Sequence, residues 1–275
     1  MVWYNNIKFE IEMNTPKKLQ ILPSEFYSQY EYLISSGVFK AISTMAEKAS
    51  FSKEDFKYYI QSSAAYSSNI EGNSIDIDTY LKNKKFKVKQ KPKEMAEIGD
   101  LIEAYNYAIK TKLTNTSFLQ AHSLLSKTIL SLKSQRGKLR NQQVGIFSGG
   151  KVEYMAVEPE FVKAEFNKLF NDINLLLSTE LTIKEVFYYA SLIHLIFEKI
   201  HPFMDGNGRA GRLLEKWFLS EKLNKNVWAI PSEKYYATHK MAYYQNIHIG
   251  YNYYELHFER CINFLLMLPK SIDNK

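Results

Sequence analysis

Residues 201–212 read HPFMDGNGRAGR, and they separate two long apolar patterns of helical period. The first pattern ends at Pro202, because proline lacks a backbone N–H and clashes with the helical turn before it. The second pattern begins after Asn207, so the glycines at 206 and 208 lie at a helix N-terminus, where free backbone N–H groups bind anions. This stretch therefore predicts two helices joined by an anion-binding loop.

Helical periodicity also dominates the rest of the chain, from about Ser24 onward. Its interruptions lie near Pro23, Gly37, Ser50, Gly72, Pro92, Gly137, Pro159, His201, Pro231 and Gly250. We therefore expect an all-α fold. A division near residue 90 separates an N-terminal helical region, residues 1–90, from residues 91–275, without creating two independent cores.

Two segments have a β pattern instead. Residues 143–155, QVGIFSGGKVEYM, contain two short β-prone runs, Val144–Phe147 and Val152–Met155, on either side of a Ser-Gly-Gly turn. This pattern predicts a β-hairpin. Apolar residues at odd positions between Trp3 and Ile11 suggest a further short strand.

Composition and length are those of a globular protein: 275 residues, 45% of them hydrophobic and 24% charged. No apolar run approaches the ~20 residues that a membrane helix needs, and the first residues lack a signal-peptide pattern. We expect a cytoplasmic protein that does not bind membranes. Cys261 is the only cysteine, which excludes a disulfide within the chain, and we expect it to pack between helices.

The formal net charge is +7, and seven lysines between Lys82 and Lys93 supply much of the excess. We interpret this run as one solvated surface loop rather than as a nucleic-acid site. The 20 tyrosines and 17 phenylalanines are spread over helical patterns, which is typical of core packing. A nucleic-acid partner is therefore not expected.

Each polar residue of the 201–212 stretch has a chemistry of its own. His201, with an ordinary pKa near ~6.5, can take a proton from a hydroxyl at physiological pH. Asp205 offers a hard oxygen ligand that suits Mg²⁺ shared with phosphates. Gly206 and Gly208 allow phosphate to approach the backbone, while Asn207 can donate from its amide and cap the following helix, so that together they stabilise charge on a phosphate. Arg209 and Arg212 lie three apart on one helix face, and their planar donor groups match phosphate oxygens.

The complete twelve-residue string resembles the signature of the Fic (filamentation induced by cAMP) family. The resemblance implies a helical core over about residues 90–230 with a β-hairpin flap. It also implies transfer of AMP from ATP to a tyrosine, serine or threonine hydroxyl of a target protein. By the same resemblance, Arg209 binds the β-phosphate and Arg212 binds the γ-phosphate.

A second motif, SSNIEG at residues 67–72, resembles the inhibitory motif of that family. Ser67 and Glu71 are four apart and so share a helix face, and Gly72 suits the left-handed residue that ends a helix. The family implies that Glu71 pairs with Arg212 and keeps it from the γ-phosphate. The alternative is an ordinary exposed glutamate at a helix end.

The resemblance implies two further groups of site residues. The hairpin corresponds to a flap that holds the target segment, through Val144, Gly145, Ile146, Phe147, Val152 and Tyr154. Tyr243 and Tyr244 stand where relatives place aromatic residues around adenine, although packing in a helical stripe explains them equally well. His122 and His194 lie in apolar patterns and are expected in the core, and His194 with Glu198 lacks the third ligand of a zinc site.

We therefore predict a self-inhibited protein adenylyltransferase that needs ATP and Mg²⁺. Alternatives are removal of AMP or another nucleotidyl transfer at the same site, and a Fic-fold binding module without turnover. Gly208 stands where relatives that act as kinases carry lysine. Self-modification and a homo-oligomeric assembly stay open at this stage, as does the identity of the target protein.

Overall fold

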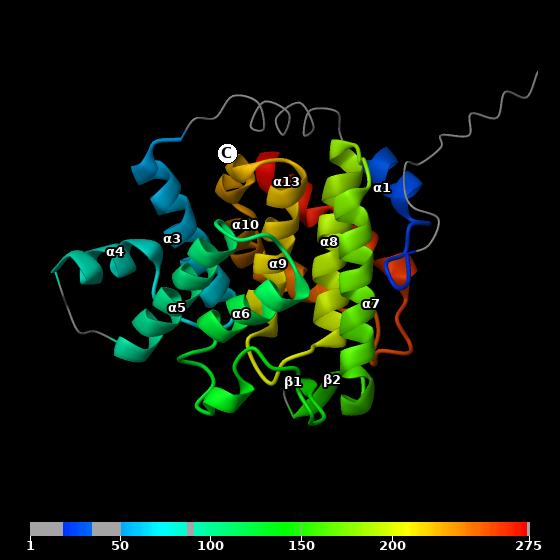
Figure 1. Ribbon diagram of the computed structural model, residues 1–275, viewed down its shortest axis with the longest axis horizontal. Helices are drawn as coiled ribbons and strands as arrows, with labels where there is room; N and C mark the ends of the chain where they lie inside the picture. Colours follow the sequence, from blue (N-terminus) through cyan, green and yellow to red (C-terminus); the bar gives the residue numbers. More distant parts are fainter. Residues whose placement is uncertain (1–18, 35–50, 87–90, 149, 274–275) are drawn as a thin grey trace, which may run out of the picture.

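The structure is a computed structural model that describes residues 19–34, 51–86, 91–148 and 150–273 (Figure 1). The strand expected between Trp3 and Ile11 and the interruptions near Gly37 and Ser50 lie outside these residues. The fold is mostly helical with one small antiparallel sheet, which confirms the expected class. None of the helices in the described ranges combines the length and the hydrophobicity of a membrane span.

The elements follow one another as α1 (Tyr27–Leu33), α3 (Lys53–Ile70), α4 (Ile77–Phe86), α5 (Pro92–Ala108), α6 (Asn115–Leu125), η1 (Lys133–Gln135), β1 (Gly145–Ser148), β2 (Lys151–Met155), α7 (Pro159–Ser178), α8 (Ile183–Ile200), α9 (Asn207–Lys222), η2 (Lys225–Ala229), α10 (Ser232–Thr238), α11 (Lys240–Ile247), η3 (Phe258–Arg260), α12 (Ile262–Leu265) and α13 (Met267–Asp273). Helix boundaries lie at the expected interruptions near Gly72, Pro92, Pro159, His201 and Pro231.

Helix α8 is the centre of the molecule. A capping box begins it, in which Thr182 accepts from the N–H of Glu185 and the Glu185 carboxylate accepts from the N–H of Thr182. Nearly all of its residues are buried, as expected for a helix that is apolar on every face. It packs most extensively against α9, and Figure 1 shows α7 beside it on the other side. The loop between α8 and α9 is thus held between two buried helices.

Helix α3 lies on the opposite flank of α9 and packs against α5, α10 and η2 (Figure 1). Its buried residues, including Ile60 and Ile70, belong to the same hydrophobic cluster as Leu213 and Ile98. The N-terminal region therefore shares its core with the rest of the chain. The boundary near residue 90 stays a prediction.

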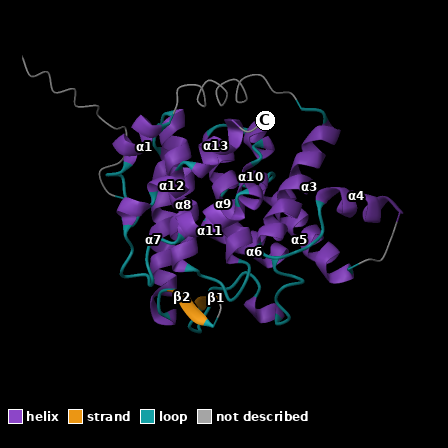
Figure 2. Ribbon diagram, turned by 180° about the vertical axis from the view of Figure 1, so that it is seen from behind, coloured by secondary structure: helices purple, strands orange, loops and turns teal. Residues whose placement is uncertain are grey.

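The β-hairpin is confirmed, and both strands begin and end within one residue of the expected positions (Figure 2). Ile146 pairs with Tyr154 and Phe147 with Val152, so Glu153 is the extra residue of a β-bulge. At the other edge of β2, the N–H of Met155 donates to the carbonyl of Tyr251. The hairpin is thus tied to the loop after α11.

The lysine-rich stretch from Lys82 to Lys93 was expected to be one loop, and this prediction is wrong. Its first part forms the last turns of α4, and its last part begins α5 with Pro92 at the first helical position. Proline suits that position because its missing N–H has no helical partner there. Lys84 and Lys85 lie in the last turn of α4, where the negative end of the helix dipole stabilises their positive charges.

Candidate active site

The loop between α8 and α9 is built from backbone conformations that its sequence permits. His201 ends α8 in the left-handed region, with φ of 50°, and Gly206 has φ of 83° immediately before α9. The amide side chain of Asn207 donates to the carbonyl of Phe203 and accepts from its N–H, both at 2.9 Å. Asn207 therefore braces the loop as the first residue of α9, and the expectation that it caps the helix is wrong.

His122 supports the same loop from α6. Its Nε2 lies 2.9 Å from the carbonyl oxygen of Asp205, which can only accept, and its Nδ1 accepts from the N–H of Gly137. The ring stacks on Phe203 at 3.5 Å between centroids. Burial lowers the pKa of His122 to about 4. Both residues are fully buried, which confirms the expected core position of His122.

His201 has one ring nitrogen available for chemistry. Its Nδ1 lies 3.3 Å from the carbonyl oxygen of Glu198, so Nδ1 carries the hydrogen and Nε2 is unprotonated. Burial, assisted by the positive charge of Arg140, lowers the pKa of His201 to about 4. The expectation that His201 has an ordinary pKa is therefore wrong. The ring is neutral at physiological pH and can accept a proton.

Arg140 connects this histidine to the hairpin, a role that the sequence did not indicate. Its guanidinium donates to the carbonyls of His201 at 2.7 Å, Gln142 at 2.8 Å and Val157 at 2.5 Å. The backbone N–H of Arg140 donates to the carbonyl of Pro202. Because Gln142 and Val157 flank the two strands, one buried cation fixes both ends of the hairpin to the loop.

Glu198 is a second residue that the sequence did not assign to the site. Its carboxylate lies 3.8 Å from Nδ1 of His201, and its Oε1 is buried with no hydrogen-bond partner among the described residues. Burial raises the pKa of Glu198 to about 7. The next residue, Lys199, has its pKa lowered to about 8 by burial, and its ammonium lies over the ring of Tyr154.

At the start of α9, Asp205 and Arg209 lie side by side. An Asp205 oxygen accepts from the N–H of Gly206 and lies 3.4 Å from Nη2 of Arg209. Nε of Arg209 is buried without a partner among the described residues, which is suited to an incoming anion. No cluster of three or more acidic, histidine or cysteine ligands occurs in the described ranges. Asp205, half exposed, thus fits Mg²⁺ held mainly by phosphate and water.

Arg212 is held mainly by the C-terminal end of α3. Its Nη2 donates to Oε1 of Glu71 at 2.7 Å and to the carbonyl of Ser67 at 2.9 Å, while Nε donates to the Ser67 hydroxyl at 2.9 Å. Arg212 is 1% exposed and Glu71 is 28% exposed. Burial raises the pKa of Glu71, but the charges of Arg212 and Arg209 outweigh it, so the net shift is downward. The side chains that the inhibitory motif predicted to meet are therefore in contact.

Glu71 also stands directly over the anion-binding loop. A Cβ placed on Gly208 would overlap Oε1 of Glu71, so glycine at this position is what allows the approach. Gly72 follows with φ of 96°, the left-handed residue expected at the end of α3.

Tyr243 and Tyr244 have different environments. Tyr243 is 2% exposed, and its hydroxyl accepts from Nη1 of Arg212 and contacts Nε2 of His194. Nδ1 of His194 is bonded to Glu215 in turn, which confirms a core histidine. Tyr243 therefore helps to orient Arg212 from inside the core, through this hydrogen bond. Tyr244 is 44% exposed, and its hydroxyl donates to the carbonyl of Ile70.

A cavity of about 290 Å³ joins these groups. Its lining comes from α3, the hairpin, α8, α9 and α11: Glu71, Ile146, Glu153, Tyr154, Glu198, Lys199, His201, Gly208, Tyr243, Tyr244, Ile247 and His248. The cavity therefore places His201, the anion-binding loop and the hairpin around one space.

The hairpin residues divide into exposed and anchored ones. Ile146, Phe147 and Val152 are 39%, 63% and 48% exposed and offer apolar contacts. Tyr154 is 2% exposed, and its hydroxyl donates to the carbonyl of Lys199 at 2.6 Å. Tyr154 therefore fastens the hairpin to α8 and lines the cavity from its buried side, and its part in holding a target stays a prediction. Gly145, which begins the first strand, and Val144 just before it are half-buried, and the Val144 carbonyl accepts from the N–H of Ala156.

Solved structures of known proteins share this fold. A Fic family protein from Desulfovibrio desulfuricans G20 superposes with a TM-score of 0.70 at 21% identity, covering 88% of this chain and 74% of that one. A Fic domain containing signaling protein from Bacteroides thetaiotaomicron gives 0.64 at 18% identity, with 86% and 94% covered. Fic-1 from C. elegans gives 0.59 at 14% identity, with 90% and 67% covered. These likenesses define a protein of the Fic fold.

The sequence match is more specific than the fold. Residues 112–219 match the model of the Fic/DOC family, and this range contains His122, Arg140 and the whole 201–212 loop. The chain therefore carries a Fic/DOC family domain, as its sequence motif indicated.

Proposed function

We propose that this chain is a self-inhibited protein adenylyltransferase, which transfers AMP from ATP to a tyrosine, serine or threonine hydroxyl of a protein. The observation that carries the proposal is the position of Glu71. Its carboxylate lies over Gly208 and binds Arg212, while the neutral ring of His201 lines the same cavity.

The reaction uses His201 as general base. Its Nε2 takes the proton of the target hydroxyl, and the hydroxyl oxygen attacks the α-phosphorus of ATP. A new phosphorus–oxygen bond forms, the bond from the α-phosphorus to the bridging oxygen breaks, and pyrophosphate leaves. The target hydroxyl needs a fixed position for this attack, and the exposed side chains of Ile146, Phe147 and Val152 supply contacts for the target segment.

The start of α9 binds the phosphates. The backbone N–H groups in the first turn of α9, including that of Gly208, and the unpartnered Nε of Arg209 offer hydrogen bonds to phosphate oxygens. Bound Mg²⁺ would neutralise charge on these oxygens, and Asp205 is the residue that would hold it. Tyr244 supplies an exposed aromatic ring at the rim for the base.

Inhibition follows from competition for Arg212. While Arg212 donates to Glu71 and Ser67, it is not available to a terminal phosphate, and the Glu71 carboxylate repels that phosphate. ATP then binds without the alignment that in-line attack requires.

The experiment uses the purified chain with ATP labelled at either the α- or the γ-phosphate. We expect protein-bound label from α-labelled ATP only, and none from the His201→Ala variant. Label from γ-labelled ATP would indicate phosphoryl transfer instead. Absence of label from both, in the wild type and in Glu71→Gly, would favour a binding module without turnover.

A further inference from the structure

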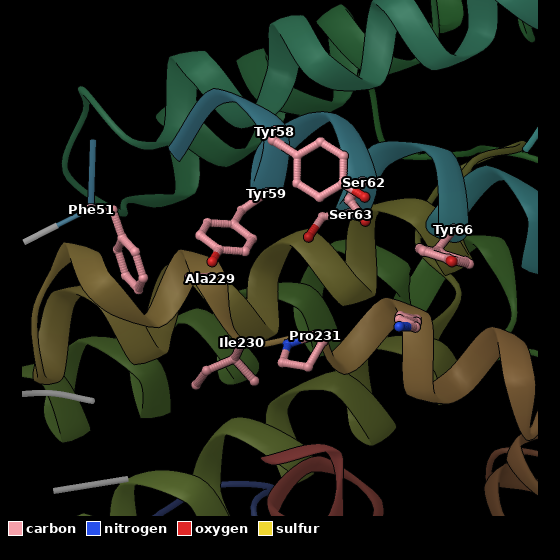
Figure 3. Close-up of a pocket in the computed structure, with 10 residues that line it drawn as sticks. Phe51, Tyr58, Tyr59, Ser62, Ser63, Tyr66, Ala229, Ile230 and Pro231 are labelled. Carbon is pink, nitrogen blue, oxygen red and sulfur yellow. The ribbon is translucent and has the colours of Figure 1, made fainter. Parts of the chain in front are cut away.

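A second cavity lies between α3 and the segment formed by η2 and α10 (Figure 3). Its volume is about 280 Å³, close to the lower limit of small-molecule sites. It shares no lining residue with the cavity at His201. One wall belongs to α3, the helix that leads to Glu71, so this cavity borders the inhibitory element on its outer side.

The walls of this cavity suit a flat aromatic ring. Phe51, Tyr58, Tyr59 and Tyr66 contribute rings, and Phe51 meets Tyr59 edge-on at 5.1 Å between centroids. Figure 3 shows Tyr59 from α3 across the cavity from Ile230 and Pro231. A ring inserted between these walls would have apolar or aromatic surface on both faces.

Two kinds of polar group complete the lining. The hydroxyl of Ser63 accepts from the ammonium of Lys216 at 2.6 Å, and its own hydrogen has no acceptor among the described residues. Lys234 is exposed, and no carboxylate in the described ranges pairs with it. An unpaired cation beside aromatic walls favours a ligand that combines a ring with an anion.

We propose that this cavity binds a small aromatic acid, with its ring between Tyr59 and the Ile230–Pro231 wall and its carboxylate near Lys234. Binding strengthens the contact between Glu71 and Arg212. This regulatory consequence rests on the proposed function, whereas the binding site itself does not.

The coupling follows from the contacts between α3 and α9. Ser63 and Ser67 lie four apart on α3, and they are bonded to Lys216 and Arg212, which lie four apart on α9. Lys216 also forms a fully buried ion pair with Glu233 of α10 at 2.5 Å. A ligand that contacts both α3 and α10 binds most tightly when α3 is packed against α9 through these bonds. Binding therefore increases the fraction of molecules in which Glu71 and Arg212 are in contact, which is the inhibited state.

The binding test uses 4-hydroxyphenylacetate as the probe and its neutral analogue 2-(4-hydroxyphenyl)ethanol, titrated into the full chain by calorimetry. We expect one acid per chain, bound about fivefold more tightly than the alcohol, the size of one partly exposed ion pair. Lys234→Gln should abolish this preference, and the matched Lys133→Gln should keep it. Ser62→Phe, which fills the cavity from α3, should abolish binding.

The assignment is overturned if the acid gives no saturable binding at millimolar concentrations, or if Lys234→Gln retains the preference. The coupling is measured separately, by hydrogen exchange of the α3 amides. We expect slower exchange with the acid bound, and unchanged exchange would overturn the coupling. Transfer of label should fall with the acid in the wild type but not in Glu71→Gly. If no variant transfers label, the proposed function fails, while the binding and exchange results still decide this inference.

Discussion

Oε1 of Glu71 accepts a hydrogen bond from Arg212 at 2.7 Å and lies against the Cα of Gly208, where a side chain would not fit. One carboxylate thus occupies both the arginine and the loop surface that a nucleotide would use. The arrangement depends on two segments far apart in the sequence, the end of α3 with Glu71 and the start of α9 with Gly208 and Arg212. Loss of the Glu71 contact should raise activity but lower stability, and the two effects can be measured separately.

Replacement of Glu71 by glycine should raise activity and lower stability. Arg212 becomes available to ATP, so we expect self-modification to rise about tenfold, the factor for one charge-assisted hydrogen bond of roughly 1.5 kcal/mol. The buried arginine then lacks its anion, so the melting temperature should fall, by about 2–4 °C for each kcal/mol lost. The matched control is Glu54→Gly in the first turn of α3, which removes a glutamate that does not contact Arg212. Equal labelling of Glu71→Gly and wild type would contradict the inhibitory role.

Gly208→Ala tests the same contact through packing. The new methyl group overlaps the Glu71 carboxylate, which must then move away from the buried Arg212, so the free energy of unfolding should fall by about 1–3 kcal/mol, the cost of leaving a buried donor without its partner. In a Glu71→Gly background the overlap is absent, and the same substitution should cost much less. Denaturant unfolding of the two single variants and the double variant measures this coupling. Additive effects would show that Gly208 is constrained by something other than Glu71.

Arg140→Lys should separate the hairpin from His201. Lysine keeps the charge but not the planar group that reaches several carbonyls, and each buried carbonyl left unbonded costs about 1–3 kcal/mol. We expect faster hydrogen exchange in β1 and β2 and a loss of label transfer of at least about tenfold. The matched control is Arg136→Lys, because the side chain of Arg136 donates to a single carbonyl among the described residues, that of Leu130. A slower transfer with unchanged exchange of the hairpin amides would refute the positioning role.

The loop and its chemistry could be predicted from the sequence because their determinants are local. Pro202 ends one helix, Gly206 permits a positive φ, and the two arginines follow on one turn. The role of Arg140 could not be predicted, because its acceptors come from residues 142, 157 and 201, which only the tertiary fold brings together.

The partners of His194 and Asn207 also depend on the tertiary fold. His194 lies one turn from Glu198, but the packing of α8 against α9 gives it Glu215 as its partner. Asn207 was expected to cap α9, yet the turn between Phe203 and α9 offers it two backbone partners instead. Single-residue propensities do not contain this information, since it depends on which helices meet.

The buried carboxyl of Glu198 should make stability depend on pH. Its pKa is raised to about 7, above its unfolded value, so the fold disfavours the ionised form. The resulting cost is small near pH 5 and complete above the folded pKa, where it reaches roughly 3 kcal/mol. Glu198→Gln removes this cost, so the variant should be more stable than the wild type at pH 8, with a much smaller difference at pH 5.

His201 acts in the opposite direction but does not obscure this test. Its pKa is lowered to about 4, so the fold disfavours its protonated form and loses stability as the pH falls from ~6.5 towards the folded pKa. Wild type and Glu198→Gln both contain His201, so its contribution largely cancels in their difference. Denaturant unfolding at both pH values gives that difference, and the exposed Glu160→Gln serves as the control. If the advantage of Glu198→Gln is the same at pH 5 and pH 8, the carboxyl of Glu198 does not titrate near neutrality, and the explanation from its burial fails.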